Sequence, residues 1–123
     1  MEATFGTKEK LKSKKEIELL FSNGKSIAKY PIRLIYKKNH TDHIVSNNTG
    51  VSVSKRNFKK AVDRNRIKRL MREGYRKNKY LVPHSTSHYF TLMFLFTGNK
   101  MPDAGLIESK IKTILKQLVI KEQ

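Results

Sequence analysis

Apolar and polar residues change their spacing from segment to segment along the chain, and each spacing predicts an element of secondary structure. Ser13 and Glu16 have the spacing of a capping box, in which side chains satisfy backbone N–H groups at the start of a helix. Apolar side chains then recur on one helical face, at Ile17, Leu20 and Phe21. Asn23-Gly24 can end a helix in the left-handed conformation. We therefore predict a helix over about residues 13–22.

Three segments have the patterns of strands. Residues 32–37 alternate, so that one face carries Ile32, Leu34 and Tyr36. Val51 and Val53 alternate with serines and predict a second strand. The polar, turn-rich residues 39–49 between them are predicted to join two antiparallel strands. The nearly continuous apolar run over residues 89–96 is typical of a strand covered on both faces.

Two longer segments repeat at helical spacing. Residues 59–77 form the first, and residues 104–120 form a last amphipathic helix. The order helix, strands, helix, strand, helix predicts an α+β fold, a two-layer sandwich of helices on a sheet. We predict a single domain over residues 1–123, in which residues 1–12 are a loose N-terminal segment.

Charge changes the picture from fold to function. The 123 residues include 27 Lys and Arg against 10 Asp and Glu, a formal net charge of +17. A polyanion is the partner that such a charge favours, with nucleic acid first and an anionic membrane surface second. The chain has no Cys, and its N-terminus lacks the apolar core of a signal peptide. We therefore expect a soluble, cytoplasmic protein without a thiolate metal site.

The basic residues are concentrated in the middle of the chain. Every arginine except Arg33 lies within residues 55–79, which hold only two carboxylates, Asp63 and Glu73. Arginine is the side chain that grips phosphates with two parallel hydrogen bonds. At about 100° per residue, one arc of the predicted helix carries Ile67, Leu70, Met71, Gly74 and Tyr75. The opposite side carries Asn65, Lys68, Arg69, Arg72 and Arg76. One face is therefore predicted to pack on a sheet while the other presents cations.

Residues 51–76, VSVSKRNFKKAVDRNRIKRLMREGYR, resemble the signature of the bacterial ribonuclease P protein subunit. In that family a "VSK" strand end leads into a helix that opens with Arg-Asn-Arg and continues with basic residues. The matching residues here are Arg64, Asn65, Arg66, Lys68, Arg69 and Arg72. Weaker similarity extends to Lys10-Leu11 and to the pattern of Phe21, Gly24 and Ser26.

The resemblance implies an αβββαβα fold with a left-handed βαβ crossover. It also implies that the Arg-Asn-Arg helix contacts the catalytic ribonuclease P RNA, and we extend this predicted surface to Lys55, Arg56 and Arg76. The implied activity is endonucleolytic hydrolysis that removes the 5′ leader of precursor tRNA. The RNA and its Mg²⁺ ions would do the chemistry, and the protein would be inactive alone. We expect one monomer in each ribonucleoprotein.

A cleft between the first helix and the sheet is implied to hold the single-stranded leader. Ile17, Phe21, Tyr36 and Lys55 are the predicted cleft residues, since single strands are held by aromatic or apolar platforms in a positive groove. Phe21 could equally be a core residue, and for Tyr36 the core interpretation is slightly favoured over the cleft. Tyr36 lies one residue further from Gly24 than the common family spacing, and a slip of one residue turns a side chain to the other face of a sheet.

Other interpretations stay open at this stage. A ribosomal or other structural RNA-binding protein has the same charge and size. A helix-turn-helix protein needs a short helix just before the basic one, where this sequence alternates as a strand. A membrane-surface helix would need a larger apolar face. No catalytic constellation is recognisable, and we predict no metal site at His84 and His88 because Pro83 favours a loop there.

Overall fold

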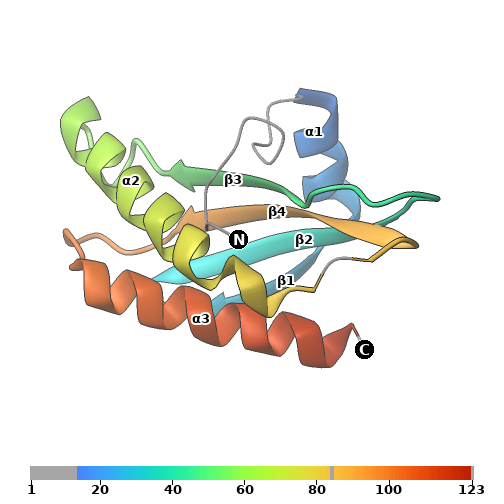
Figure 1. Ribbon diagram of the computed structural model, residues 1–123. Helices are drawn as coiled ribbons and strands as arrows, with labels where there is room; N and C mark the ends of the chain where they lie inside the picture. Colours follow the sequence, from blue (N-terminus) through green and yellow to red (C-terminus); the bar gives the residue numbers. More distant parts are fainter. Residues whose placement is uncertain (1–13, 84, 123) are drawn as a thin grey trace.

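The computed structural model describes residues 14–83 and 85–122 (Figure 1). The predictions for residues 1–12, for Lys10-Leu11, for Ser13 of the capping box and for His84 lie outside this part of the chain. None of the described helices is long and apolar enough to cross a membrane.

The elements follow one another in the order αβββαβα that the family resemblance implied. They are α1 (Lys14–Asn23), β1 (Lys25–Lys29), β2 (Ile32–His40), β3 (Asn48–Val53), α2 (Ala61–Asn78), a 3-10 turn (Lys79–Leu81), β4 (His88–Phe96) and α3 (Ala104–Lys121). The predicted helices and strands are thus confirmed to within a few residues, and β1 is the one strand that the apolar pattern alone did not indicate.

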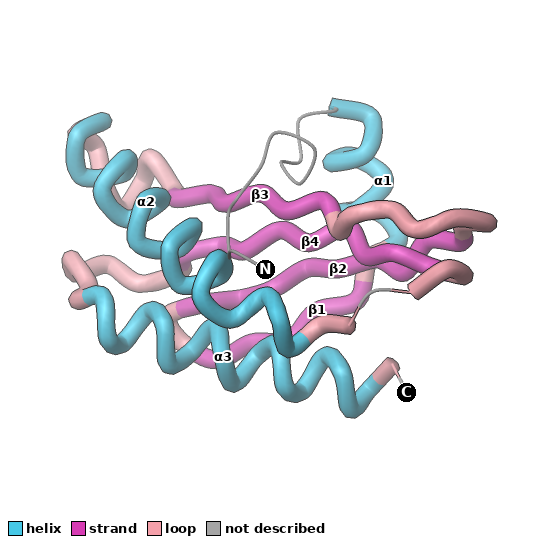
Figure 2. Tube along the Cα trace, viewed as in Figure 1, coloured by secondary structure: helices cyan, strands magenta, loops and turns pink. Residues whose placement is uncertain are grey.

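The strands form one sheet in the order β1-β2-β4-β3 (Figure 2). β2 is antiparallel to both β1 and β4, whereas β3 is parallel to β4. β2 and β3 therefore run in opposite directions, as predicted, but they do not pair with each other because β4 lies between them. In Figure 1 the chain leaves β3, passes through α2 in front of the sheet and returns in β4, which makes this crossover left-handed. The usual hand of such a connection is right.

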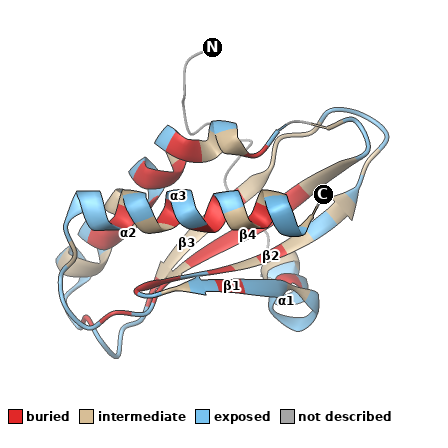
Figure 3. Ribbon diagram, turned by 90° about the horizontal axis from the view of Figure 1, so that it is seen from below, coloured by how far each residue is buried: buried red, intermediate tan, exposed pale blue. Residues whose placement is uncertain are grey.

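The two faces of the sheet are covered unequally. α2 and α3 lie on one face, which we call the two-helix face, and α1 lies on the other, the α1 face (Figure 3). α3 contacts β1 and β2, and α2 contacts β3. The main core lies between these helices and the sheet and includes Leu34, Phe94, Ile67, Tyr75 and Ile111. β4 is buried along most of its length on both faces, as its apolar run predicted.

A glycine lets α2 and α3 approach closely. A Cβ atom at Gly74 would lie 3.1 Å from the Cδ1 atom of Ile111 on α3, so a larger residue would require the Ile111 side chain to shift. The buried Asn78 side chain donates a hydrogen bond of 2.8 Å to the Gly74 carbonyl and holds the last turns of α2. Tight packing of the two helices fixes how α2 is rotated, and this rotation decides which of its side chains face solvent.

Residues 54–60, just before α2, form a turn and a loop rather than a helix. A helix-turn-helix protein needs a short helix just before its recognition helix. The helix-turn-helix interpretation of this chain is therefore wrong. Phe58 anchors the loop, because its ring packs on Phe96 at the end of β4 with centroids 5.8 Å apart.

Candidate RNA interface

α2 separates its apolar and basic residues onto different faces. Ile67, Met71, Gly74 and Tyr75 are buried, as the helical spacing predicted, and Leu70 is half-buried. Asn65, Arg66, Arg69 and Arg72 are exposed, and Lys68 and Arg76 are half-buried along the border of this surface. The packing of α2 on α3 and the sheet therefore turns the predicted cations toward solvent.

Arg69 and Arg72 are exposed cations of this face. Neither forms an ion pair or a hydrogen bond with another side chain among the described residues. Arg76 differs, because its Nε atom donates a hydrogen bond of 2.9 Å to the carboxylate of Glu73. This bond holds the pKa of Glu73 below its ordinary value, although desolvation acts in the opposite direction. Arg69 and Arg72 are thus ready to bind phosphate without first breaking a contact within the protein.

Arg64 has a structural role that the sequence pattern did not reveal. Its Nη1 atom donates hydrogen bonds to the carbonyls of Phe58 and Lys59, at 2.8 and 2.9 Å. These bonds fasten the loop before α2 to the first turns of the helix. No sequence signal indicates this role; in the structure Arg64 lies one turn after Lys60, the N-cap of α2, which makes no side-chain cap hydrogen bond. Arg64 is therefore a positioning residue, whatever else it contacts.

Lys55 and Arg56 extend the basic surface beyond the helix. Both are exposed in the loop that Arg64 holds, between the end of β3 and the start of α2. The backbone N–H of Arg56 donates to the Ser54 hydroxyl at 3.1 Å, which shapes the turn. We call the exposed cations of this loop and of α2 the basic surface; they are Lys55, Arg56, Arg66, Arg69 and Arg72.

On the other side of the sheet, α1 presents an aromatic ring to solvent. Leu20 is fully buried beneath the helix, whereas the side chain of Phe21 is 53% exposed. Ile17 is half-buried and lies one turn before Phe21 on the same side of α1. The interpretation of Phe21 as a core residue is therefore wrong, and its exposed ring is available for stacking.

Two contacts fix α1 against the sheet. The Asn48 side chain at the start of β3 donates a hydrogen bond of 3.2 Å to the carboxylate of Glu16. At the other end of α1, a Cβ atom on Gly24 would lie 2.4 Å from the Leu20 carbonyl oxygen and 3.0 Å from Ile35 on β2. Only glycine permits this approach, which brings the end of α1 onto the strand.

The prediction that Tyr36 lines the leader cleft is wrong. Tyr36 is 1% exposed and belongs to the core on the two-helix face. It shares this face with Leu34, because side chains two residues apart on a strand point the same way. Its hydroxyl donates a hydrogen bond of 3.0 Å to the Glu122 carboxylate after α3. Tyr36 therefore lies on the opposite face of the sheet from α1 and Phe21, and the alternative interpretation of Tyr36 as a core residue is confirmed.

The α1 face carries other residues that the sequence analysis missed. The alternation of β2 places Ile35 and Lys37 on this face, and both are half-buried. β4 adds Leu95, which is half-buried, next to Ser52 on β3. The sequence pattern could have identified them, because the residues that lie between the core-facing positions of a strand point to its opposite face. An apolar and partly charged strip therefore runs along the sheet beside α1.

Lys55 does not lie beside Phe21, so the four predicted cleft residues do not form one compact cleft. α1 contacts the start of β3 through Asn48, whereas Lys55 follows the end of that strand. β3 has six residues, which span about 20 Å at 3.3 Å each. An extended ligand of several units would be needed to contact both Phe21 and Lys55.

Within residues 14–83 and 85–122, no group of three or more His, Cys, Asp and Glu side chains could hold a metal ion. The carboxylates that do form contacts are committed to structural partners, as Glu16 is to Asn48 and Glu122 is to Tyr36. The described surface thus has the features of a binding protein: a basic helix, and a strip with one exposed aromatic ring.

Comparison with known proteins gives one family. Residues 5–119 match the family model described as Ribonuclease P. The chain is similar to the ribonuclease P protein component of Porphyromonas gingivalis, with 36% identity over 118 residues, 92% of this chain and 86% of that protein. It is also 35% identical to the component of Thermotoga maritima over 83 residues, 68% of each chain.

Solved structures agree with the fold. The ribonuclease P protein of Thermotoga maritima superposes with a TM-score of 0.71 and 26% identity, covering 89% of this chain and 96% of that chain. The Staphylococcus aureus ribonuclease P protein gives the same TM-score at 23% identity, which bears on the fold alone, and covers 89% of this chain and 94% of that chain.

Proposed function

This chain belongs to the bacterial ribonuclease P protein family, and we propose that it is the protein subunit that binds ribonuclease P RNA and the 5′ leader of precursor tRNA. In this role it assists the endonucleolytic removal of the leader in the cytoplasm, as one copy in each ribonucleoprotein. The single observation that carries the proposal is the two-sided α2, whose buried face fixes the helix while its exposed face presents Arg66, Arg69 and Arg72.

The basic surface suits the phosphates of a folded RNA. Exposed arginines on one side of a helix can bind phosphates bidentately. Their helix packs closely on α3 at Gly74. A net charge of +17 adds a long-range attraction that releases counterions when RNA binds. Arg64 contributes by holding the Lys55–Arg56 loop in line with the helix.

The α1 face suits a single strand. Phe21 offers an exposed ring on which a base can stack, and Ile17 extends this apolar surface by one turn. Ile35 and Leu95 line the sheet beside it, and Lys37 supplies a charge for the backbone. A leader that continued along the face would reach Lys55 beyond the end of β3. The leader therefore binds on the side of the sheet opposite the core.

The reaction is the hydrolysis of one phosphodiester bond, which releases the leader and leaves the mature 5′ end of the tRNA. The described residues do not fit a protein-bound Mg²⁺ site, so we assign the Mg²⁺ ions to the RNA subunit and route no step through the protein. The protein acts by binding and by orienting the substrate.

Reconstitution tests this function. Purified protein is added to ribonuclease P RNA at low Mg²⁺ concentration, and cleavage of a precursor tRNA is followed on a gel. We expect the protein to raise the cleavage rate at the mature 5′ end, and the protein without RNA to leave the substrate intact. Cleavage at that position by RNA-free protein, or no effect of the protein on the RNA, would contradict the proposal.

A further inference from the structure

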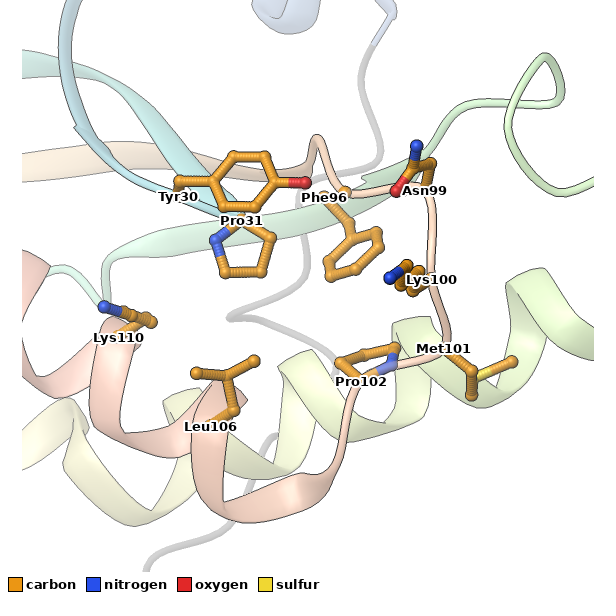
Figure 4. A pocket seen from close by; sticks show the side chains of 10 residues that line it. Tyr30, Pro31, Phe96, Asn99, Lys100, Met101, Pro102, Leu106 and Lys110 are labelled. Carbon is orange, nitrogen blue, oxygen red and sulfur yellow. The ribbon is translucent and has the colours of Figure 1, made fainter.

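A hollow lies at the end of the sheet away from α1. It has a volume of about 540 Å³ and is formed by the β1–β2 turn, the loop after β4 and the first turns of α3 (Figure 4). Tyr30 and Pro31 come from the turn, and Leu106 and Lys110 come from α3. Its volume falls within the roughly 300–1,000 Å³ of small-ligand pockets.

The lining combines a flat aromatic ring, apolar walls and positive charge. Tyr30 is 69% exposed although its ring borders the hollow, and Leu106 is 38% exposed. Figure 4 shows the rings of Tyr30 and Phe96 on one side and Leu106 on the other. The charged lining residues are Lys100 and Lys110, and among residues 14–83 and 85–122 no carboxylate lines the hollow. This combination fits a planar, apolar group attached to an anion.

Glycine keeps the hollow open. A Cβ atom on Gly98 would lie 2.8 Å from the Phe96 ring and 3.0 Å from Pro31, both of which line the hollow. Any side chain at position 98 would therefore push these two walls out of place. The shape of the hollow thus depends on a close approach that only glycine allows.

The hollow borders the basic surface. The Asn57 side chain, next to Arg56, donates a hydrogen bond of 3.3 Å to the carbonyl of Gly98 in the hollow wall. Phe58 packs on Phe96 from the other side. The Lys55–Arg56 loop is therefore joined to the wall of the hollow through Asn57, whereas α1 lies at the opposite end of the sheet (Figure 1).

We propose that this hollow binds one unstacked nucleotide of the RNA that the basic surface contacts, with the base on Tyr30 and the neighbouring phosphates at Lys100 and Lys110. The inference rests on the proposed function, since it takes its RNA from there. A nucleotide is favoured over an acidic peptide because the hollow continues the basic surface and offers a flat ring for a flat base. The hollow is distinct from the strip beside α1 that is proposed to bind the leader.

The test compares two tyrosines that are equally exposed. Tyr30 and Tyr80 are each 69% exposed, and Tyr80 lies outside the hollow. The affinity of the full chain for ribonuclease P RNA is measured for the wild type, Tyr30→Ala, Tyr30→Phe and Tyr80→Ala. We expect Tyr30→Ala to weaken binding by roughly five- to a hundredfold, the range for loss of one base stack. Tyr30→Phe and Tyr80→Ala should stay within about twofold of the wild type.

A second measurement separates a base pocket from a simple anion site. The isotope-labelled full chain is titrated with adenosine monophosphate and, separately, with inorganic phosphate, and backbone amide resonances are followed. We expect adenosine monophosphate to shift Gly98, Asn99 and Lys100 more than phosphate does, and Tyr30→Ala to abolish the difference. Equal shifts from both ligands, or none, would overturn the proposal.

The outcomes also separate this proposal from the proposed function. If Arg69→Ala/Arg72→Ala weakens RNA binding while Tyr30→Ala does not, the hollow does not bind RNA and the proposal is overturned, whereas the basic surface still binds RNA. If the wild type fails to bind ribonuclease P RNA at all, the proposed function is wrong, and the adenosine monophosphate titration alone decides whether the hollow takes a nucleotide.

Discussion

The two faces of the sheet differ in how much of their surface the described helices cover. On the two-helix face, α2 and α3 are each 18 residues long and bury five residues apiece. On the α1 face, α1 has 10 residues and buries only Leu20. One face is therefore filled by the chain, and the other leaves Ile35 and Leu95 half-buried beside an exposed Phe21. The difference teaches that the proposed leader site lies on the side of the sheet opposite the main core, whereas the basic surface lies on the outer side of α2, a helix that covers this core.

The division has a simple physical consequence. Changes on the two-helix face remove packing, so they should lower the free energy of unfolding and leave the affinity of the folded protein unchanged. Changes on the α1 face or on the solvent side of α2 should do the reverse, because exposed side chains contribute little to stability. The following variants test this separation.

The largest effect is expected in the core. Phe94 is fully buried in β4, and its ring lies 5.7 Å from that of Tyr75. Phe94→Ala should lower the free energy of unfolding by roughly 3–5 kcal/mol, because it leaves a cavity. Phe21→Ala is the matched control and should cost less than about 1 kcal/mol. Urea denaturation measures both, and similar losses for the two phenylalanines would contradict the separation of the faces.

The basic surface should show the opposite behaviour. Arg69→Ala/Arg72→Ala should weaken binding to ribonuclease P RNA by roughly 1–3 kcal/mol for each charge-assisted contact that is lost. Its circular dichroism should match the wild type, because both side chains are exposed. Lys112→Ala/Lys116→Ala is the control, since it removes two exposed charges from α3. Equal weakening by both double variants would mean that net charge, rather than this surface, binds the RNA.

A smaller effect on stability is expected at Tyr36. Tyr36→Phe keeps the ring in the core but removes the hydrogen bond to Glu122, which should cost about 1–2 kcal/mol of unfolding free energy. Binding of the leader should not change, because the ring points away from the α1 face. Affinities for precursor tRNA of the assembled particle, wild type against variant, check this. A selective loss of affinity for leader-bearing tRNA would mean that Tyr36 does contribute to leader binding.

The same residue gives a pH dependence. Burial, together with the hydrogen bond and the charge of Glu122, raises the pKa of Tyr36 to about 12 from its ordinary value of 10.0. Because the folded pKa is raised, this stabilisation is fully present below pH 10 and is lost as the pH rises toward 12. Urea midpoints measured between pH 9 and 11.5 should therefore fall more steeply for the wild type than for Tyr36→Phe. Parallel curves would show that the hydroxyl does not couple to folding.

The elements with strong local patterns were predictable from the sequence, and those that depend on distant partners were not. α2, α3 and β4 each repeat their apolar residues over many positions, so their pattern is clear. β1 buries only Ile27, because it is an edge strand. The insertion of β4 between β2 and β3 depends on pairing between residues that are 43 to 64 positions apart in the sequence, and a local pattern does not reveal such pairing.

The candidate site divides in the same way. The solvent side of α2 could be predicted because helical spacing fixes which residues oppose the apolar arc. The alternation of β2 puts Tyr36 on one face with Leu34, but it does not decide between core and cleft, because packing against distant helices determines which face is covered. Arg64 looked like one cation among many, since nothing in the sequence shows that its guanidinium meets the carbonyls of Phe58 and Lys59.

The central claim, that the face left open by the core binds the leader, is tested most directly by Phe21→Leu. Leucine keeps most of the side-chain volume but removes the aromatic surface on which a base can stack. Dissociation constants are measured for the particle assembled with ribonuclease P RNA, using precursor tRNA with a leader and mature tRNA without one. The account predicts roughly 1–3 kcal/mol weaker binding of the leader-bearing tRNA and an unchanged affinity for mature tRNA. Equal losses for both tRNAs, or no loss for either, would contradict it.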